Sequence, residues 1–210
     1  MKLLIIGGTG RTGQELIKQA LEYGHILTAL VRNPGKLKMI HPGLKVVKGD
    51  ILDSQIVEEV VTGQDAVISV LGHKKFFIMT TILSEGTKNM ILAMEKCNVN
   101  RFICVTSLGI NDSRFKLGLY YTLFVIPFIV FFYFWDKSRQ EKLIKKSRLN
   151  WTIVRPGQFT NGRKRGRYKH GAHVGNYILT KMISRADAAD FILSQLNDDT
   201  YLHKTPGVTY

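Results

Sequence analysis

Residues 1–13 read MKLLIIGGTGRTG, a short apolar strand that runs directly into glycines at positions 7, 8, 10 and 13. The helical pattern QELIKQAL follows at residues 14–21. This order of strand, glycine turn and helix is typical of a site for the pyrophosphate of a dinucleotide. Gly7 permits the tight turn, Gly10 lets the backbone approach a phosphate, and Gly13 lets the helix pack closely on the strand. The helix then points unpaired N–H groups and its positive dipole end at the anion.

Strand and helix patterns alternate along the rest of the chain. We expect strands at residues 3–6, 25–31, 45–48, 65–71, 101–106 and 151–154. We expect helices at residues 11–23, 54–61, 80–97, 137–148 and 184–196. This alternation predicts an α/β fold, a Rossmann-like doubly wound parallel sheet with helices on both faces. Residues 1–210 are expected to form a single domain.

The segment 117–135 interrupts this pattern, because it is apolar and carries no charge. By length it could just cross a bilayer. A strand of the same sheet is predicted on each side of it, however, and Pro127 interrupts any helix, so we exclude a membrane span. We interpret the segment as an insertion that forms a buried lid or a subunit interface. Two alternatives are a wall for an apolar, ring-shaped substrate and shallow attachment to a membrane surface.

The formal net charge of +14 is unevenly distributed. Between Asp136 and His170, twelve Lys and Arg residues are opposed only by Asp136 and Glu141. We interpret this run as a solvated basic face. The alternative is attraction of phosphates or acidic substrates by a basic loop at residues 157–176 on the substrate side. The run contains no recognisable nucleic-acid module, so no nucleic-acid partner is expected.

Cys97 and Cys104 have neither metal-ligand spacing nor the pattern of a disulfide framework. Both lie in apolar patterns, so buried, reduced thiols and a cytoplasmic location are expected. No signal peptide is expected, because the first residues already read as a core strand. His73, His170 and His173 form no metal set with a nearby pair of acids, and we interpret them as lone surface histidines.

The residue that ends the second predicted strand distinguishes the two nicotinamide dinucleotides. NAD-binding proteins commonly place Asp or Glu there, to bind the ribose 2′-hydroxyl. This chain has Arg32 there, Lys36 four residues later, and no acid between Tyr23 and Asp50. An arginine can hold a 2′-phosphate through charge-assisted hydrogen bonds, and Arg11 adds a second contact. The sequence therefore predicts NADP(H) rather than NAD(H).

Eight short motifs occur in a recognisable order: GGTGRTG at 7–13, LVRN at 30–33, GDI at 49–51, GQDAVIS at 63–69, SEGTKN at 84–89, TS at 106–107, WTIVRP at 151–156 and ISRAD at 183–187. Together they resemble the atypical short-chain dehydrogenase/reductase group, whose members bind NAD(P)H. Within that group, the chain is most similar to the biliverdin reductase B (flavin reductase) branch and to NmrA-like proteins. The resemblance covers nearly the whole chain and implies an NAD(P)-binding Rossmann domain.

The resemblance also implies which residues lie along the cofactor. The expected contacts are Gly7, Thr9, Gly10 and Thr12 at the pyrophosphate, Arg32, Gly35 and Lys36 at the 2′-phosphate, Asp50 and Ile51 at the adenine, Leu71 and Gly72 along the ribose and pyrophosphate, and Thr106 and Ser107 near the nicotinamide. Gln158 and Phe159 are expected on the substrate side. Gln158 occupies the place where biliverdin reductase B has a histidine, so an acid–base group for tetrapyrrole reduction is missing there.

Short-chain dehydrogenases commonly use a serine with a Tyr-x-x-x-Lys pair, which makes Ser107, Tyr133 and Lys137 the catalytic candidates. Tyr133 and Lys137 share a helical face if their helix begins early enough. A lysine beside a phenol makes the phenol a stronger acid. For Ser107, the alternative is a hydroxyl that simply caps a turn.

The sequence thus predicts an NADPH-dependent oxidoreductase that reduces a small aromatic acceptor of the flavin, quinone or tetrapyrrole class. A flavin acceptor needs no protein acid, because solvent can supply the proton, and the loop Arg163–Arg167 could attract a flavin phosphate. The alternative is a non-catalytic NADP(H)-binding redox sensor or scaffold of NmrA type. A monomer or a homodimer is expected.

Overall fold

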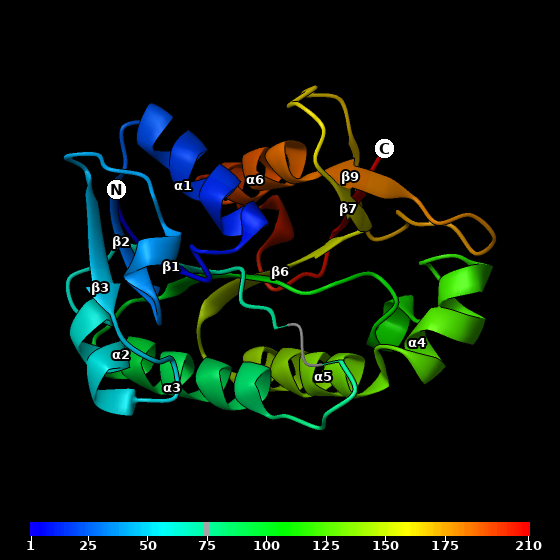
Figure 1. The fold of residues 1–210 in the computed structure, drawn as a ribbon, viewed down its shortest axis with the longest axis horizontal. Helices are drawn as coiled ribbons and strands as arrows, with labels where there is room; N and C mark the ends of the chain where they lie inside the picture. Colours follow the sequence, from blue (N-terminus) through cyan, green and yellow to red (C-terminus); the bar gives the residue numbers. More distant parts are fainter. Residues whose placement is uncertain (74–75) are drawn as a thin grey trace.

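The computed structural model describes residues 1–73 and 76–210, and eight of its described strands build one large sheet (Figure 1). From edge to edge the strands are β3 (Leu44–Lys48), β2 (Ile26–Val31), β1 (Lys2–Ile6), β4 (Ala66–Ser69), β5 (Arg101–Val105), β6 (Asn150–Pro156), β10 (Gly207–Thr209) and β8 (Lys169–Gly171). Neighbours run parallel, except for the antiparallel pair β10 and β8. The predicted Rossmann-like parallel sheet is therefore confirmed.

Helices cover both faces of the sheet, as Figure 1 shows. On one face lie α1 (Arg11–Glu22) and α6 (Arg185–Ser194), which pack against each other. On the other face lie α2 (Ser54–Val61), α3 (Ile82–Lys96) and α5 (Phe131–Lys146). Short elements complete the fold: the two-stranded parallel sheet of β7 (Gln158–Thr160) and β9 (Met182–Ser184), and the 3₁₀ turns η1 (Pro34–Lys36), η2 (Asn111–Ser113) and η4 (Asp199–Tyr201).

The central strand β1 shows why its sequence is continuously apolar. Successive side chains of a strand point to opposite faces, and both faces of this sheet are covered. Leu3 and Ile5 pack into the cluster beneath α1 and α6, whereas Leu4 and Ile6 pack into the cluster beneath α2, α3 and α5. From β1 the chain continues to β2 on one side and returns at β4 on the other. This switch of direction opens a crevice at the carboxyl ends of the strands.

Helix α5 begins at Phe131, six residues before the start expected from the sequence. The early start is stabilised by Asp136, a fully buried residue of α5. Its carboxylate accepts hydrogen bonds from the backbone N–H groups of Leu83 (2.9 Å) and Ser84 (3.1 Å), at the N-terminus of α3. An anion in this position satisfies free N–H groups and the positive end of the helix dipole. The contact fixes α5 against α3.

The apolar segment 117–135 contains a π-helical turn, η3 (Tyr121–Val125), the short helix α4 (Ile126–Phe128) and the first turns of α5. The expectation of a buried lid is wrong for its outer side, where Phe128 is 73% exposed. No described part of the chain covers the outer side of this segment. Across residues 1–73 and 76–210, no helix has the length and apolar character that a bilayer span requires.

The solvated basic face expected between Asp136 and His170 is only partly formed. Lys142, Lys145 and Lys146 are exposed. Lys137 and Arg155, in contrast, are only 3% and 1% exposed. Burying a charged side chain costs free energy, so such a side chain lies inside a protein only where it has partners. These two residues therefore belong to the interior of the site described below.

The two cysteines differ in their surroundings. Cys104 on β5 is fully buried, and burial raises the pKa of its thiol to about 12. Cys97, at the end of α3, is only half-buried. The expectation of buried thiols therefore holds for Cys104 alone, and both cysteines are free.

Candidate active site

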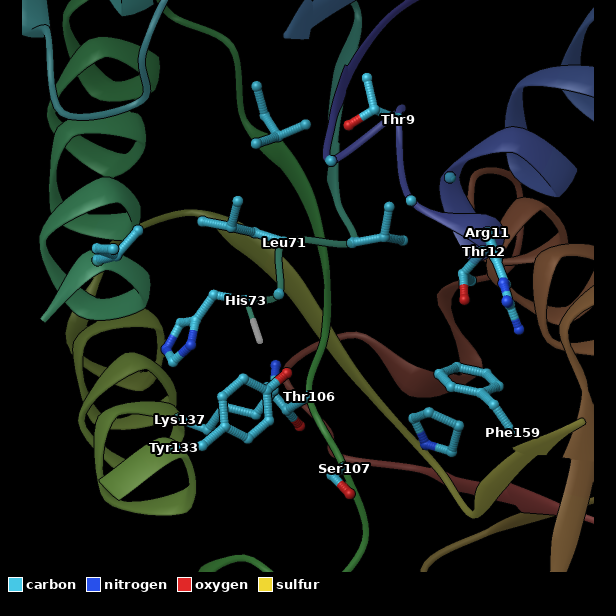
Figure 2. Close-up of a pocket in the computed structure, with 18 of the residues that line it drawn as sticks. Thr9, Arg11, Thr12, Leu71, His73, Thr106, Ser107, Tyr133, Lys137 and Phe159 are labelled. Carbon is cyan, nitrogen blue, oxygen red and sulfur yellow. The ribbon is translucent and has the colours of Figure 1, made fainter. Parts of the chain in front are cut away.

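A cleft of about 970 Å³ lies at the carboxyl ends of β1, β2, β4, β5 and β6. Figure 2 shows the glycine turn and the start of α1 on one side, and Tyr133 and Lys137 on α5 on the other. Ser107 lies between them at the end of β5, and Phe159 lies on the side of Arg11 and Thr12, across the cleft from Tyr133. This is the position where doubly wound sheets bind their ligands.

The glycine turn has the geometry that its sequence predicts. Gly7 has a φ of +87°, and its carbonyl accepts a hydrogen bond of 3.0 Å from the N–H of Gly10. A Cβ atom on Gly13 would overlap the carbonyl oxygen of Gly7, so only glycine fits there. Gly10 caps α1 without any side-chain hydrogen bond, and the first turn of α1 holds no acid. The N-terminus of α1 therefore faces the cleft in the form that an anion can bind.

The end of the cleft that was predicted to hold the adenosine is formed by the loops after β2 and β3. Arg32 and Lys36 are exposed and line its rim. Ile51 is buried, and the absence of a side chain on Gly86 makes room for it, because a Cβ there would lie 2.8 Å from the Cγ2 atom of Ile51. The side-chain amide of Asn89 donates to the carbonyl oxygen of Ile51 at 3.1 Å. The SEGTKN motif thus shapes this end of the cleft from α3.

Tyr133 and Lys137 share one face of α5, as their spacing predicts. The Nζ atom of Lys137 lies 5.3 Å from the centroid of the Tyr133 ring and donates to the carbonyl oxygen of Val105 at 3.2 Å. The His73 ring meets the Tyr133 ring edge-on, with centroids 4.9 Å apart, and its Nε2 lies 3.0 Å from the hydroxyl of Thr80. His73 is therefore a half-buried part of the cleft wall, and its interpretation as a lone surface histidine is wrong.

A buried ionic network supports the floor of the cleft. Glu141 is fully buried and accepts hydrogen bonds from Nε (2.9 Å) and Nη2 (2.6 Å) of Arg155, and from the hydroxyl of Thr106 (2.7 Å). Arg155 also forms a bidentate pair with Asp112, with both N···O distances 2.8 Å. Burial would lower the pKa of Arg155, but its bonds to Glu141 and Asp112 outweigh burial and raise it. The hydrogen bond from Arg155 lowers the pKa of Asp112 to about 2.

This network fixes Thr106, and Thr106 precedes Ser107 in the chain. The Ser107 hydroxyl donates to the carbonyl oxygen of Leu108 at 2.8 Å. Ser107 thus both lines the cleft and makes the turn-capping bond that was the alternative for it.

The side of the cleft that was predicted to face the substrate carries aromatic and cationic groups. Gln158 and Phe159 line it, and the guanidinium carbon of Arg185 lies 5.3 Å from the centroid of the Phe159 ring. Arg11 and Arg185 also line a smaller adjoining hollow of about 200 Å³. Partial burial and the neighbouring charge of Arg11 lower the pKa of Arg185. Two arginines thus meet where α1 and α6 begin.

The cleft brings together nearly all the candidate residues. Those that line it are Gly7, Thr9, Gly10, Arg11, Thr12, Gly13, Arg32, Lys36, Asp50, Ile51, Leu71, Gly72, Thr106, Ser107, Tyr133, Lys137, Gln158 and Phe159. Gly35 is the exception, because turn η1 directs its neighbour Lys36 to the rim instead. The individual roles of these residues remain predictions.

The basic loop Arg163–Arg167 lies elsewhere. Lys164 forms an ion pair with Asp190 on α6 at 2.7 Å and donates to the hydroxyl of Tyr23 at 2.9 Å. These contacts hold the loop near the C-terminal end of α1, and none of its residues lines the cleft. Of the loop 157–176 that was expected on the substrate side, Gly157, Gln158 and Phe159 do line the cleft, and the expectation is wrong for Arg163–Arg167.

Sequence reasoning missed Phe76 and Arg185 in the cleft wall, whereas Tyr121 and Phe134 belong to the segment 117–135, for which a substrate wall was one alternative. Arg185 was quoted only as part of the ISRAD motif. Its place as the first residue of α6, whose N-cap is Ser184, was the available signal. Phe76 lies outside the segment 117–135, and no motif of the sequence included it.

Two relatives illustrate the similarity at the level of sequence. A chloroplastic protein of Arabidopsis thaliana that is described as uncharacterized is 31% identical over 173 residues, which cover 76% of this chain and 60% of the relative. The photosystem II assembly factor Ycf39 of Synechocystis is 25% identical over 165 residues, which cover 77% of this chain and 46% of that protein. The chain thus spans about half to three fifths of the length of these relatives.

Solved structures show the same fold. The oxidoreductase ylbE of Lactococcus lactis has a TM-score of 0.83 at 22% identity, with 100% of this chain and 90% of that chain covered. The anaerobilin reductase ChuY of Escherichia coli O157:H7 has a TM-score of 0.82 at 22% identity, covering 100% and 97%. A short-chain dehydrogenase/reductase of Veillonella parvula in complex with NADP has a TM-score of 0.81 at 19% identity, covering 100% and 94%.

The sequence profile of the NAD(P)H-binding family matches residues 7–199. The matched region begins at the glycine turn and includes every loop that forms the cleft. It also covers far more than half of the chain. The chain therefore belongs to the NAD(P)H-binding family.

Proposed function

We propose that this protein is an NADPH-dependent oxidoreductase that reduces a small aromatic acceptor. The observation that carries the proposal is the composition of one cleft, which joins an anion-binding glycine turn to a wall of aromatic rings. The polar end suits a dinucleotide, and the aromatic end suits a planar acceptor that stacks on rings.

The residues present fit NADPH. The uncapped N-terminus of α1 and the open backbone at Gly10 suit a pyrophosphate. Arg32 and Lys36 offer two cations at the rim where a 2′-phosphate would lie, and the adjoining β2 and η1 carry no acid. NADPH rather than NADH is the proposed cofactor on this ground.

When bound, the nicotinamide supplies a hydride, and the chain must position the acceptor beside it. Lys137 is suited to hold a hydroxyl or a developing negative charge, because its side chain is buried and its Nζ atom is held over the Tyr133 ring. Ser107 offers a hydroxyl at the end of β5. Arg11 and Arg185 are suited to attract an acidic group of the acceptor, the role first expected of the loop at 163–167.

A flavin is the acceptor that these residues suit best. Gln158 cannot act as an acid, and a flavin does not require one, because solvent can protonate the reduced ring. Quinones remain within the proposed acceptor class for the same reason. Tetrapyrroles are included because ChuY, a protein of similar fold, is an anaerobilin reductase.

NADPH oxidation by the purified protein, measured with flavin, quinone and tetrapyrrole acceptors in turn, tests the proposal. Turnover with a flavin or quinone supports it. Tight NADPH binding without turnover of any acceptor would favour the second candidate, a non-catalytic NADP(H)-binding sensor or scaffold. That candidate draws support from the relative named as an assembly factor. A cytoplasmic location is also proposed, because both cysteines are free.

A further inference from the structure

One end of the molecule exposes a continuous apolar surface, which we call the apolar end face and define as residues 119–131 and 177–179. Figure 1 shows α4 and the loop that leads into β9 at this end. The most exposed side chains include Phe128 (73%) and Ile178 (74%). Large exposed apolar patches are uncommon on monomers, and they mark surfaces that bind another molecule or a membrane.

Hydrogen bonds hold the two segments of the apolar end face together. The N–H of Leu119 donates to the carbonyl oxygen of Ile178 at 3.1 Å, and the Thr180 hydroxyl donates to the carbonyl oxygen of Leu117 at 3.1 Å. Within the first segment, the rings of Tyr120 and Phe124 stack with centroids 6.1 Å apart. The rings of Tyr120 and Phe124 therefore lie side by side on the apolar end face.

The charges around this face indicate what covers it. Residues 113–135 and 142–186 contain no Asp or Glu, whereas Arg114, Lys116 and Lys181 flank the apolar segments. A basic rim around apolar and aromatic side chains is complementary to a bilayer that contains anionic lipid. A second copy of this chain would bring two such basic rims together, and like charges oppose that contact.

The shape of the segment fits contact with the lipid surface. Helix α4 contains Pro127 and ends at Phe128, and the described helices include none long and apolar enough to span a bilayer. Short helices with aromatic and aliphatic side chains on one side can insert to the level of the lipid headgroups. We propose that the apolar end face docks this protein on the surface of an anionic membrane.

Docking would also place the cleft at the lipid surface. Tyr121 and Val130 belong to the first segment of the apolar end face and also line the cleft. If the proposed oxidoreductase function holds, an apolar acceptor dissolved in the bilayer, such as a quinone, would reach the aromatic wall directly. This consequence rests on the proposed function, whereas the docking itself does not.

Sedimentation of the 210-residue chain with lipid vesicles, without cofactor or acceptor, tests the docking. We expect the protein to bind vesicles of phosphatidylcholine mixed with phosphatidylglycerol, to bind phosphatidylcholine alone much less, and to be released in part by salt. The variant F124S/F128S should lose about tenfold or more of the binding, because it removes two rings from the apolar end face. The control variant L52S/L92S changes two exposed leucines on other parts of the surface and should bind as the wild type does.

Circular dichroism and NADPH binding would show that both variants remain folded. Failure of the wild type to bind the anionic vesicles, or equal binding by F124S/F128S, would overturn the proposal. A dimer in solution that F124S/F128S dissociates, without vesicle binding, would assign the face to a second copy instead. Because NADPH oxidation with soluble flavin is measured separately, failure of docking and failure of the proposed function are distinguishable.

Discussion

The ammonium of Lys137 lies over the ring of Tyr133, 5.3 Å from its centroid, while donating to the carbonyl oxygen of Val105. The ring therefore supports a buried cation as well as lining the cleft. Cation–π contacts of this kind depend on the aromatic face and not on the hydroxyl group. The Tyr133 ring can therefore position Lys137 whether or not the phenol hydroxyl donates a proton, and the two roles can be tested separately.

Substitutions at these two positions should therefore have unequal effects. Lys137→Met should lower kcat/KM for flavin reduction by about tenfold to a hundredfold, because it removes a buried charge from the cleft. Tyr133→Phe should keep kcat/KM within about threefold, because the supporting ring remains. Steady-state kinetics with NADPH and flavin provide the measurement. An equal loss in Tyr133→Phe would show instead that the phenol donates a proton.

The glycine turn offers a matched pair of substitutions. Gly10→Val should abolish NADPH binding, because a side chain there leaves no room for a phosphate, and should lower the thermal midpoint only slightly, because its Cβ would lie 3.3 Å from the carbonyl oxygen of Gly7, a tight contact that a small shift relieves. Gly13→Val should instead destabilise the fold, because its side chain would meet the carbonyl oxygen of Gly7. Thermal unfolding and NADPH titration of both variants separate the two effects. Unchanged NADPH affinity in Gly10→Val would contradict the location of the pyrophosphate.

The buried pair of Arg155 and Glu141 should respond strongly to the loss of one partner. Glu141→Ala leaves the guanidinium buried and only partly paired, and should destabilise the protein by about 3–5 kcal/mol. The double variant E141L/R155M removes both charges and should recover much of that loss. Urea denaturation gives both values. A loss below about 1 kcal/mol in Glu141→Ala would show that the network contributes little to stability.

Asp112 predicts a specific dependence of stability on pH. Its pKa in the folded protein is about 2, below the ordinary value of about 3.9. Its contribution is therefore complete above about pH 4 and is lost as the pH falls through about 2. Because its side chain is 64% exposed, the contribution should stay below about 1 kcal/mol. Urea midpoints of the wild type and Asp112→Asn should differ at pH 7 and converge near about pH 2. A difference that grows towards low pH would contradict this pairing.

Much of the fold and of the cofactor end of the cleft could be predicted, because local sequence determines both. The glycine turn from Gly7 to Gly13 requires residues without side chains, and helix α2 was predicted at Ser54–Val61, where the structure has it. Lys36 and Arg32 follow β2 directly, so their place at the rim depends only on the end of one strand.

The acceptor end could not be predicted in the same way, because it depends on contacts between distant parts of the chain. Helix α5 begins early because Asp136 caps α3, a pairing that no local pattern reveals. The basic loop was expected beside the acceptor, but the ion pair of Lys164 with Asp190 holds it on α6. The exposure of Phe128 went against the favoured interpretation, because apolar segments are usually buried, and only the alternative of attachment to a membrane surface allowed for it.

The discrimination between NADPH and NADH tests the central claim most directly, and equilibrium titration of both cofactors against the wild type and Arg32→Asp measures it. The wild type should bind NADPH more tightly than NADH. Arg32→Asp should weaken NADPH binding by about a hundredfold, through loss of charge-assisted bonds to the 2′-phosphate and repulsion by the new carboxylate. NADH binding should change by less than about threefold, because NADH has no 2′-phosphate. Equal losses for the two cofactors, or a wild type that prefers NADH, would contradict the account.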